Sequence, residues 1–219
     1  MTPRTAAEEA ICDAYQWAAD VLLTYHTNPW ELDAALENAG YAMGPCLRQD
    51  AEGLEHAYAR RKSRRADPDV LHVPSVDRAV EEGRLGRSVG WGWYRYPGGG
   101  GPVEDPLVED LLTEEAWLRK LTRSDLDDAQ IVHRMDLAIG NAALAVIGQT
   151  LSSGHDVDRI ASEALHRHSA PKLTDMLRGI GPDNFATQLA ALDGLLRGPW
   201  RLTPHAQAGW HQLKSLQGD

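Results

Sequence analysis

Hydrophobic residues recur at helical spacing at the start of the chain. Apolar residues in the first 25 positions form one stripe: Ala7, Ile11, Ala14, Tyr15, Ala18, Leu22 and Tyr25. Polar side chains such as Glu9 and Asp13 fall on the opposite face. This spacing predicts one long amphipathic helix, with its apolar stripe turned toward a protein core.

The next segment carries the start and stop signals of a shorter helix. Asn28 is a good N-cap, Pro29 suits the first helical position, and Glu31 lies where a capping box places a carboxylate. Gly40 suits the end of the helix. Further helices are expected at 47–65, 74–84, 156–166, 170–178, 183–197 and 204–216. The pattern as a whole predicts an all-α protein.

A long helix is expected from residue 125 to about residue 151, with Ser124 as its cap. Its hydrophobic residues lie on nearly all sides, which predicts a buried central helix. Gly140 and Gly148 lie on one side of it. Because glycine lowers helix propensity, we expect the backbone of another segment to approach closely there.

The composition of the sequence changes in the segment "GRLGRSVGWGWYRYPGGGGP", residues 83–102. Its glycines and aromatic residues predict a short ribbon of strands around Trp91–Tyr96 and a tip at residues 98–101. The glycines do not fit GxGxxG, and no lysine follows as in a P-loop. We therefore do not expect this segment to hold a nucleotide phosphate.

The chain contains a weak internal repeat. The first helix followed by "NPWELDAALENA" parallels the central helix followed by "HDVDRIASEAL", and Asp33 aligns with Asp158. We expect two pseudo-repeated helical units: residues 1–97 with the Gly/Trp-rich linker ribbon, and residues 98–219. Both should pack as one all-α body around the long central helix.

Composition and charge narrow the class of protein. A net charge of −10 and a pI of about 5.3 argue against nucleic acid as the main partner. No apolar run approaches the roughly 20 residues of a membrane span, and the N-terminus resembles no secretory signal. Cys12 and Cys46 are too few for a disulfide scaffold. We expect a cytoplasmic protein with thiols.

One basic cluster runs against the acidic balance: Arg60, Arg61, Lys62, Arg64 and Arg65. It predicts either a solvated helix end or a local site for a phosphate group. A polar group of His166, His168 and Lys172 suggests no metal site, because no third firm ligand is spaced to complete one.

Three ordered motifs carry a resemblance to a known family. They are "LDAALENAGYAMGPCLRQDAEGLE", "GRLGRSVGWGWYRY" at residues 83–96, and "HRMDLAIGNAALAV" at residues 133–146. In this order the chain resembles the C-terminal helical part of the 3-hydroxyacyl-CoA dehydrogenase family, in its tandem form from β-oxidation multienzyme proteins. The resemblance implies an all-α fold of the 6-phosphogluconate-dehydrogenase C-terminal type.

The departures from the family pattern bear on the reaction. In the family an N-terminal Rossmann domain binds NAD and supplies the catalytic histidine and glutamate, and this sequence starts where that domain is expected to end. The family's active-site asparagine aligns with Glu9, the motif proline with Ala42, and the linker lysines with Ser88 and Trp91. We therefore expect no bound cofactor and no NAD-dependent hydride transfer by this chain alone.

The candidate catalytic residues are His133, Asp136 and Glu9. His133 and Asp136 lie three residues apart on the central helix, so their side chains can meet and form an acid–base pair. The family expects an apolar residue at position 136. The alternative is a structural ion pair near the helix start. Glu9 lies at the family's active-site edge, although a first-turn carboxylate also simply favours the helix dipole.

The candidate substrate-binding residues are Glu8, Arg48, Asp50 and Asn141. Glu8 adjoins Glu9, Arg48 and Asp50 follow the stretch "ENAGYAMGP" at residues 37–45, and Asn141 is the asparagine of the second-copy helix. Arg48 and Asp50 have a second interpretation, as partners of each other or of neighbouring helices. No metal ligand set is expected.

Three functions fit these observations. The favoured hypothesis is a non-redox catalyst of elimination, substitution or ring closure on a small molecule in biosynthesis. A second is a substrate-binding subunit that completes a separately encoded NAD-dependent dehydrogenase. A third is a dimerisation module. The expected partners are a small molecule and either a second copy or another protein, without nucleic acid or membrane.

Overall fold

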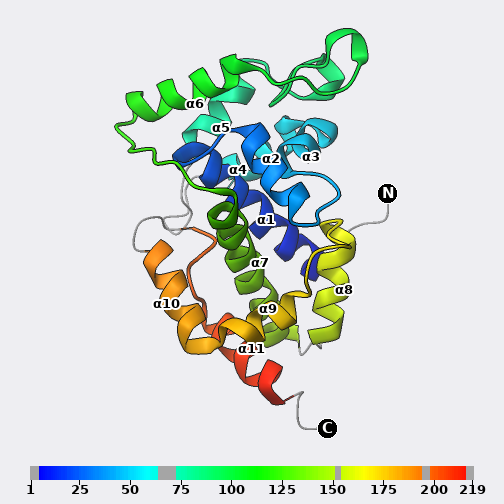
Figure 1. Cartoon of the computed structure of the whole chain (residues 1–219), viewed down its shortest axis with the longest axis vertical. Helices are drawn as coiled ribbons and strands as arrows, with labels where there is room; N and C mark the ends of the chain where they lie inside the picture. The colour runs from blue at the N-terminus through cyan, green and yellow to red at the C-terminus, as the bar shows by residue number, and fades with distance from the viewer. Residues whose placement is uncertain (1–4, 64–72, 151–153, 194–197, 216–219) are drawn as a thin grey trace. The chain divides into compact units, whose positions relative to one another are not determined.

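The first two helices form where the stripes and caps predict them. Helix α1 spans Ala6–Tyr25 and α2 spans Pro29–Asn38 (Figure 1). The backbone N–H of Glu31 donates to Asn28 Oδ1 at 3.0 Å, so Asn28 caps α2 as expected. Local sequence signals are therefore enough to place the beginning of this helix.

The computed structural model describes residues 5–63, 73–150, 154–193 and 198–215. Within these ranges the elements are α-helices, two 3-10 turns and three isolated bridges, which confirms the all-α class. The remaining helices are α3 (Pro45–Glu52), α4 (Leu54–Ser63), α5 (Pro74–Glu81), α6 (Pro106–Leu118), α7 (Asp128–Thr150), α8 (Gly154–Ala164), α9 (Leu173–Ile180), α10 (Pro182–Asp193) and α11 (Pro204–Ser215).

The chain gathers into two units that do not follow chain order. The first unit holds residues 1–18, 39–42 and 132–219, and the second holds residues 19–38 and 43–131. Helices α1 and α7 each contribute to both units. The division into residues 1–97 and 98–219 was argued from sequence similarity between the two halves, not from contacts in space. That division stays a prediction.

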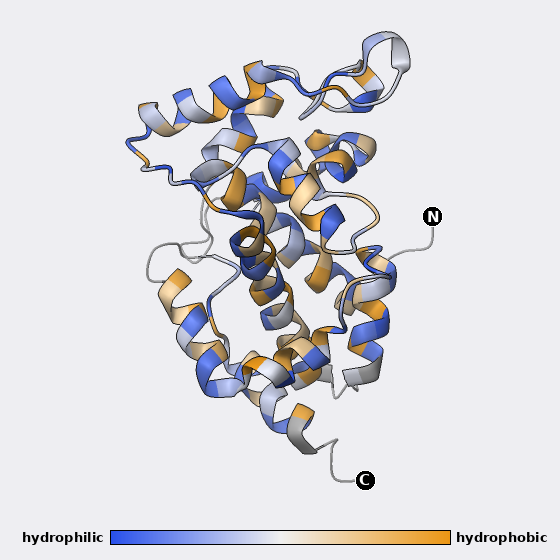
Figure 2. Ribbon diagram, in the orientation of Figure 1, coloured by the Kyte–Doolittle hydropathy of each residue, from blue (hydrophilic) through white to orange (hydrophobic). Residues whose placement is uncertain are grey.

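In the first unit Gly148 of α7 lies against the backbone of another helix, as predicted. A side chain at Gly148 would meet the backbone of His205, and one at Gly209 would meet the backbone of Leu144. Helices α7 and α11 therefore cross with their backbones in close contact. Gly140 differs, because it faces the side chains of α9 and α10. Apolar segments recur along α7 in Figure 2.

Three details of the fold differ from the expectations. The helix expected at 47–65 is broken into α3 and α4 at Gly53, which has φ +98°. The expected cap Ser124 does not cap α7: its oxygens meet His26 Nδ1, and Asp127 and Gln130 form the capping box instead. Helix α6 was not expected at all.

The expected strands are reduced to single bridges. Gly86 pairs with Trp91, Trp91 with Arg95, and Arg95 with Val103. The bridges are interrupted by 3-10 turns at Arg87–Val89 and Pro97–Gly99. Residues 84–103, called the ribbon below, therefore form an irregular hairpin that belongs to the second unit.

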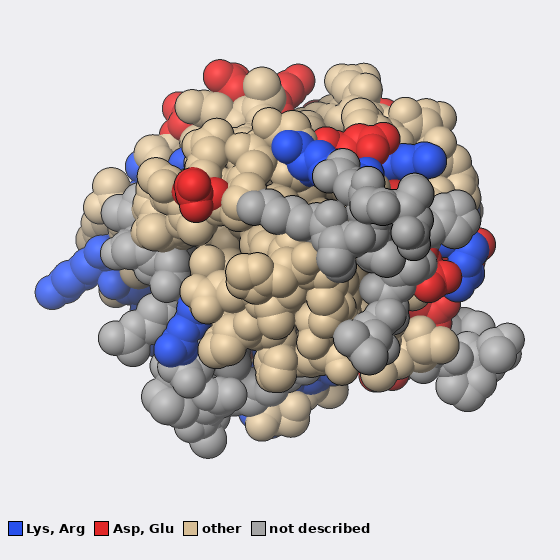
Figure 3. All heavy atoms as spheres, turned by 90° about the horizontal axis from the view of Figure 1, so that it is seen from below, with Lys and Arg blue, Asp and Glu red and all other residues tan. Residues whose placement is uncertain are grey.

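Charge and hydropathy add two observations. Helix α7 is long and apolar enough over Asp128–Gln149 to cross a membrane by length and composition, and 61% of the tested stretch is buried inside the protein, as in a core helix. The face drawn in Figure 3 has a largely uncharged centre, with basic and acidic side chains at its rim.

Candidate functional site

The side chains of Tyr41 and Arg167 both contact the carboxylate of Asp136 in the first unit. Tyr41 Oη donates to Asp136 Oδ1 at 3.5 Å, and an Arg167 Nη2–H donates to the same oxygen at 3.5 Å. The Arg167 guanidinium also lies 5.3 Å from the centre of the Tyr41 ring. We call Tyr41, Asp136 and Arg167 the Asp136 cluster.

Close backbone contacts hold Tyr41 in this position. Gly40 has φ +99°, and a side chain there would collide with the backbone of Ser169 and Ala170. The N–H of Ala42 donates to the carbonyl of His166 at 2.9 Å. The turn of the motif "ENAGYAMGP" therefore docks on the loop after α8, which explains why glycine precedes Tyr41.

The Tyr41 ring is fixed on its other side by α1. Its centre lies 5.7 Å from that of Tyr15, and the two planes are inclined by only 13°. Such a stacked pair of buried aromatic rings restricts the phenol to one orientation. The hydroxyl that faces Asp136 is therefore held by packing before any substrate is present.

Burial dominates the electrostatics of the cluster. It raises the pKa of Asp136, while the charges of Arg167 and His133 and the hydrogen bond from Tyr41 oppose the shift. Burial also raises the pKa of Tyr41. The Asp136 side chain is still 21% exposed, so a proton can be exchanged with solvent. A carboxyl with a raised pKa and a solvent path can act as a general acid or base.

Arg167 has unused hydrogen-bonding capacity beside the carboxylate. Its side chain is 5% exposed, and its buried Nε has no hydrogen-bond partner among the residues that the structure describes. A buried donor of this kind is costly unless water or a ligand satisfies it. The cluster can therefore offer a further donor to an incoming polar group.

The other two candidate catalytic residues lie at exposed positions. His133 is exposed on α7 and acts on Asp136 through its charge, whereas the hydrogen bonds to Asp136 come from Tyr41 and Arg167. Glu9 is exposed in the first turn of α1. Their catalytic roles stay predictions.

Glu8 has a structural contact at the start of α1. Its carboxylate accepts from the N–H of Thr5 at 2.6 Å, and its own N–H donates to Thr5 Oγ1 at 3.3 Å. These reciprocal bonds form a capping box. A substrate-binding role for Glu8 stays a prediction that competes with this cap.

Asp50 anchors the ribbon within the second unit. Its carboxylate accepts from the backbone N–H groups of Trp93 at 2.8 Å and Tyr94 at 2.9 Å, and from Tyr96 Oη at 2.9 Å. Burial raises its pKa to about 6, against the effect of these donors. Arg48 pairs with Glu52 at 3.2 Å rather than with Asp50. Asp50 is thus occupied by the fold, and substrate binding by either residue stays a prediction.

Asn141 ties α7 to the segment before α11. Its Nδ2 donates to the carbonyls of Pro199 at 3.0 Å and Arg201 at 2.9 Å. Its buried Oδ1 finds no hydrogen-bond partner within the described part of the chain. The amide is therefore half satisfied by the backbone, and its expected role in substrate binding stays a prediction.

The basic cluster near the end of α4 contributes a buried ion-pair network. Arg61 donates to Asp20 at 2.9 Å and to Asp77 at 2.8 Å. Lys62 lies over the ring of Tyr58. Arg64 and Arg65 lie outside the described residues. Arg61 is thus committed to two carboxylates rather than to a phosphate.

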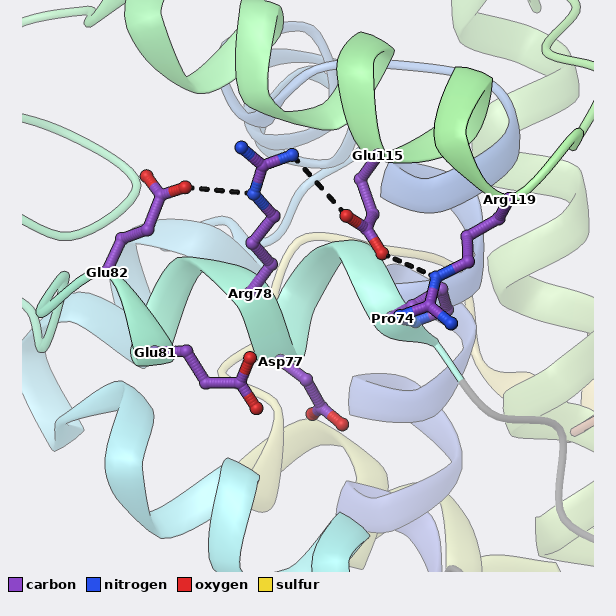
Figure 4. A pocket seen from close by; sticks show the side chains of 7 residues that line it. All are labelled: Pro74, Asp77, Arg78, Glu81, Glu82, Glu115 and Arg119. Carbon is purple, nitrogen blue, oxygen red and sulfur yellow. Dashed lines mark hydrogen bonds and ion pairs between the residues drawn. The ribbon is translucent and has the colours of Figure 1, made fainter.

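A polar groove of about 740 Å³ lies between α5 and α6 of the second unit (Figure 4). Arg78 pairs with Glu82 at 2.9 Å and Glu115 at 3.4 Å, and Arg119 pairs with Glu115 at 2.8 Å. A smaller hollow of about 510 Å³ surrounds Arg123, which donates to carbonyls at the end of α1. Both hollows are lined by charges that the fold already uses.

The residues of the ribbon do not fit a nicotinamide dinucleotide. Such a cofactor needs a strand, a glycine turn and a helix whose N-terminus faces the pyrophosphate. Here the ribbon leads into α6, whose first turn is capped by Asp105: the N–H of Leu107 donates to its carboxylate at 3.3 Å. That carboxylate would repel a phosphate. No cluster of three metal-ligating side chains occurs in the ranges given above either.

Comparison with known proteins confirms the resemblance found in the sequence. Residues 9–96 match the family described as 3-hydroxyacyl-CoA dehydrogenase, C-terminal domain. The chain is 28% identical over 162 residues to the peroxisomal bifunctional enzyme of Danio rerio, across 67% of this chain and 23% of that protein. It is 25% identical over 173 residues to the human peroxisomal bifunctional enzyme, across 72% and 24%. The chain thus spans about a quarter of these relatives.

Two solved structures share the fold. The dehydrogenase part of multifunctional enzyme 1 from C. elegans matches with a TM-score of 0.68 and 17% identity, over 92% of this chain and 46% of that one. The 3-hydroxybutyryl-CoA dehydrogenase of Escherichia coli K12 matches with a TM-score of 0.61 and 16% identity, over 96% and 59%. Residues 9–96 thus match the C-terminal domain of the 3-hydroxyacyl-CoA dehydrogenase family, and the two structures share the helical fold of nearly the whole chain.

Proposed function

We propose that the Asp136 cluster performs acid–base chemistry on a small molecule, without hydride transfer by this chain. The observation that carries this proposal is a half-buried carboxyl, at a position where the family pattern has an apolar residue, facing a phenol and a guanidinium. A new ionisable group in such surroundings is a candidate for function.

The chemistry follows from the three side chains. Asp136 holds or accepts a proton nearer to neutral pH than an exposed aspartate does, because burial raises its pKa. Arg167 stabilises negative charge that develops on a bound oxygen, and Tyr41 orients that oxygen through its hydroxyl. Elimination, substitution and ring closure each require such a proton transfer. A role in small-molecule biosynthesis in the cytoplasm is part of this proposal.

A second candidate function is a helical subunit that completes an NAD-dependent 3-hydroxyacyl-CoA dehydrogenase. Two observations favour it: the relatives are bifunctional or multifunctional enzymes, one of them named for fatty acid beta-oxidation, and the matched segment is a fraction of each. Exposed Glu9, at the family's active-site position, would then face a partner domain.

Solvent deuterium exchange tests the first function directly. The purified chain is incubated in D2O with a panel of enoyl and 3-hydroxyacyl thioesters and β-hydroxy acids, and exchange at carbon is followed by NMR. We expect exchange with the unaltered chain, loss of at least about a hundredfold in Asp136→Asn, and full activity in the exposed control Glu163→Gln. Exchange that is equal in Asp136→Asn would remove the cluster from consideration.

Fluorescence titration with NADH separates the two functions. The seven tryptophans report binding through quenching. Weak or absent quenching by the isolated chain agrees with the first function. Tight binding would contradict our inference that the ribbon is no nucleotide cradle. Dehydrogenase activity that appears only after a NAD-binding domain is added would favour the second function instead.

A further inference from the structure

The ion pair between Arg167 and Asp136 is longer than the ion pairs that hold the fold together. Arg167 Nη2 lies 3.5 Å from Asp136 Oδ1, whereas the buried pair of Arg84 and Asp105 in the second unit closes at 2.9 Å. A charge-assisted hydrogen bond normally measures about 2.7–2.9 Å. The fold therefore does not use the full binding capacity of the Arg167 guanidinium.

One edge of this guanidinium is open to a second carboxylate. The Nε and Nη2 atoms of an arginine lie on the same edge and can donate to both oxygens of one carboxylate. Asp136 contacts only Nη2, and the buried Nε of Arg167 has no partner in the described ranges. The Tyr41 ring, 5.3 Å from the guanidinium, holds it in place. The side chain of Arg167 is thus a prepared but half-filled carboxylate fork.

The surroundings of this edge favour an anion from solvent. Asp136 borders the edge and is partly exposed, so a ligand can approach along its side chain. Arg167 belongs to the loop "HRHSAPK", residues 166–172, which contains no acidic residue. His166, His168 and Lys172 of this loop are exposed. On a chain with a net charge of −10, such a loop is a local attraction for an anion.

We propose that the substrate of this site is a carboxylic acid, whose carboxylate displaces Asp136 from the open edge of Arg167. The inference rests on the proposed function, because it names the substrate class for the same acid–base group. After the displacement, Asp136 has lost its cation and lies beside a second negative charge. Two carboxylates so close do not both stay ionised, so Asp136 takes up one proton from solvent. The neutral Asp136 is then a proton donor beside the bound acid.

The charged and titratable groups that face Asp136 come from three elements. Arg167 lies on the loop after α8, His133 on α7 itself, and Tyr41 on the turn after α2. Burial raises the pKa of Asp136, and the charge of Arg167 is the largest influence that opposes the shift. A ligand that occupies Arg167 weakens this opposition. Proton uptake is therefore the expected signature of carboxylate binding.

NMR titration of the full chain with 3-hydroxybutyrate and 3-hydroxyhexanoate tests the substrate class. Their methyl esters are the matched neutral ligands. We expect at least one acid to bind at pH 6 with a Kd on the order of 1–10 mM, typical of so small a ligand, and its ester to bind at least about tenfold more weakly. Equal binding of acid and ester overturns the proposal. So does the failure of both acids to bind at up to about 50 mM.

The pH dependence of the Kd measures the proton. The acids stay ionised between about pH 6 and pH 8, and the slope of log Kd against pH gives the number of protons taken up on binding. We expect the Kd to rise with pH, with a slope that approaches one at pH 8. A Kd that is independent of pH would overturn the coupling between the bound carboxylate and Asp136.

The Asp136→Asn variant assigns the proton to its group. It keeps Arg167 but cannot titrate, so the acid should bind it more tightly than the unaltered chain at pH 8, by about tenfold or more, and without pH dependence. A slope that persists in this variant would assign the proton to the histidines His133, His166 and His168, and would overturn the proposed coupling.

The Arg167→Gln variant assigns the anion to its group. The acid should bind it at least about tenfold more weakly, while binding of the ester stays the same. Arg159→Gln is the matched control, because Arg159 forms an exposed ion pair with Glu163 on α8, and it should bind the acid like the unaltered chain. If Arg167→Gln loses its native circular dichroism, Arg167→Lys replaces it: the charge stays but the two-pronged contact is lost, so weaker binding is still expected.

Deuterium exchange keeps this inference separate from the proposed function. If Asp136→Asn loses exchange while acid and ester bind alike, the acid–base function stands and the carboxylate class is wrong. If the acid binds with proton uptake while exchange is equal in Asp136→Asn, the acid–base function is wrong and the carboxylate site stands.

Discussion

Helices α3 and α9 both begin without a capping side chain of their own, and in each case an aspartate of the preceding helix supplies the cap, in different surroundings. The N-cap residues of α3 and α9, Gly44 and Lys172, make no side-chain capping bond. In the second unit, Asp33 of α2 accepts from the N–H groups of Cys46 at 2.8 Å and Leu47 at 2.9 Å. Backbone N–H groups in the first turn of a helix have no partner inside the helix, and a carboxylate can accept their hydrogen bonds.

The first unit uses the aligned aspartate for the same purpose. Asp158 of α8 accepts from the N–H of Thr174 at 3.0 Å and from its hydroxyl at 2.6 Å. Asp158 is partly exposed, whereas Asp33 is 2% exposed. The weak sequence repeat thus corresponds to a shared capping arrangement inside each unit.

The ribbon makes the difference between the two aspartates. Tyr94 of the ribbon donates its hydroxyl to Asp33 Oδ2 at 2.9 Å and covers it. Burial then raises the pKa of Asp33 to about 7, against the donors that lower it. A side chain at Gly44 would collide with the Asp33 carboxylate. Glycine is therefore required at position 44 by the carboxylate that lies against it, whereas Pro45 suits the first turn of α3, where its missing N–H is not needed.

The largest expected effect comes from removing the buried aspartate. Asp33→Ala removes the acceptor of two backbone N–H donors in the second unit and leaves the Tyr94 hydroxyl only the carbonyl of Pro29, 3.3 Å away. It should lower the free energy of unfolding by about 3–5 kcal/mol. Urea denaturation measures it, with the surface variant Glu163→Ala as control. A loss below about 1 kcal/mol would show that water replaces the carboxylate.

The pH dependence of stability should follow from the same burial. The pKa of Asp33 is about 7 in the folded protein against an ordinary value of 3.8, so the folded state binds more protons between these values. The stability from this group is fully present below about pH 4 and is lost as the pH rises toward about 7. Asp50, with a pKa of about 6, acts in the same direction.

Thermal denaturation between pH 4 and pH 8 measures this dependence. The melting temperature should fall with rising pH, and Asp33→Asn should flatten the slope because the amide does not titrate. Thr113→Ala changes an exposed residue that does not titrate, serves as the control, and should leave the slope unchanged. A slope in Asp33→Asn as steep as in the unaltered chain would mean that Asp33 does not cause the pH dependence.

Replacing the partly exposed Asp158 should lower the free energy of unfolding less than replacing the buried Asp33. Asp158→Ala removes the cap of α9 at a partly exposed carboxylate, so a loss of about 1–2 kcal/mol is expected, typical of a helix cap. The comparison with Asp33→Ala is made under the same conditions. Equal losses at both positions would contradict the role that we assign to the ribbon.

Local sequence signals predict much of the fold. Prediction from sequence fails where contacts between distant residues decide the structure. Asn28 and Pro29 placed the start of α2, but the equally local signal of Asp105 and Pro106 at α6 was missed. Ser124 has the residue type of a cap, yet its contact with His26, 98 residues away, left the capping box to Asp127 and Gln130. Residue type alone does not reveal such competition.

The candidate site shows the same limit. Asp136 was chosen from sequence because a carboxylate stands where the family is apolar. Its partners Tyr41 and Arg167 lie 95 and 31 residues away in the chain, and were not identified. The sequence "HRHSAPK", unusual for a family turn, was the available signal for Arg167. Asp50 and Asn141 bond to backbone groups that are more than 40 residues away in the chain. Only the folded structure brings these groups together, so no local sequence pattern indicates the contacts.

The smallest expected effect comes from the hydroxyl of Tyr94, which donates to Asp33 and also lies 3.3 Å from the carbonyl of Pro29. Tyr94→Phe removes the hydroxyl donor to Asp33 but keeps both helix N–H donors, so the free energy of unfolding should fall by about 1 kcal/mol. It should also raise the pKa of Asp33 further, because that hydrogen bond favours the carboxylate. Thr174→Val removes the corresponding hydroxyl from Asp158 and is the matched variant. NMR titration of the Asp33 carboxyl carbon measures the shift, and an unchanged pKa in Tyr94→Phe would mean that the ribbon acts on Asp33 by covering it alone.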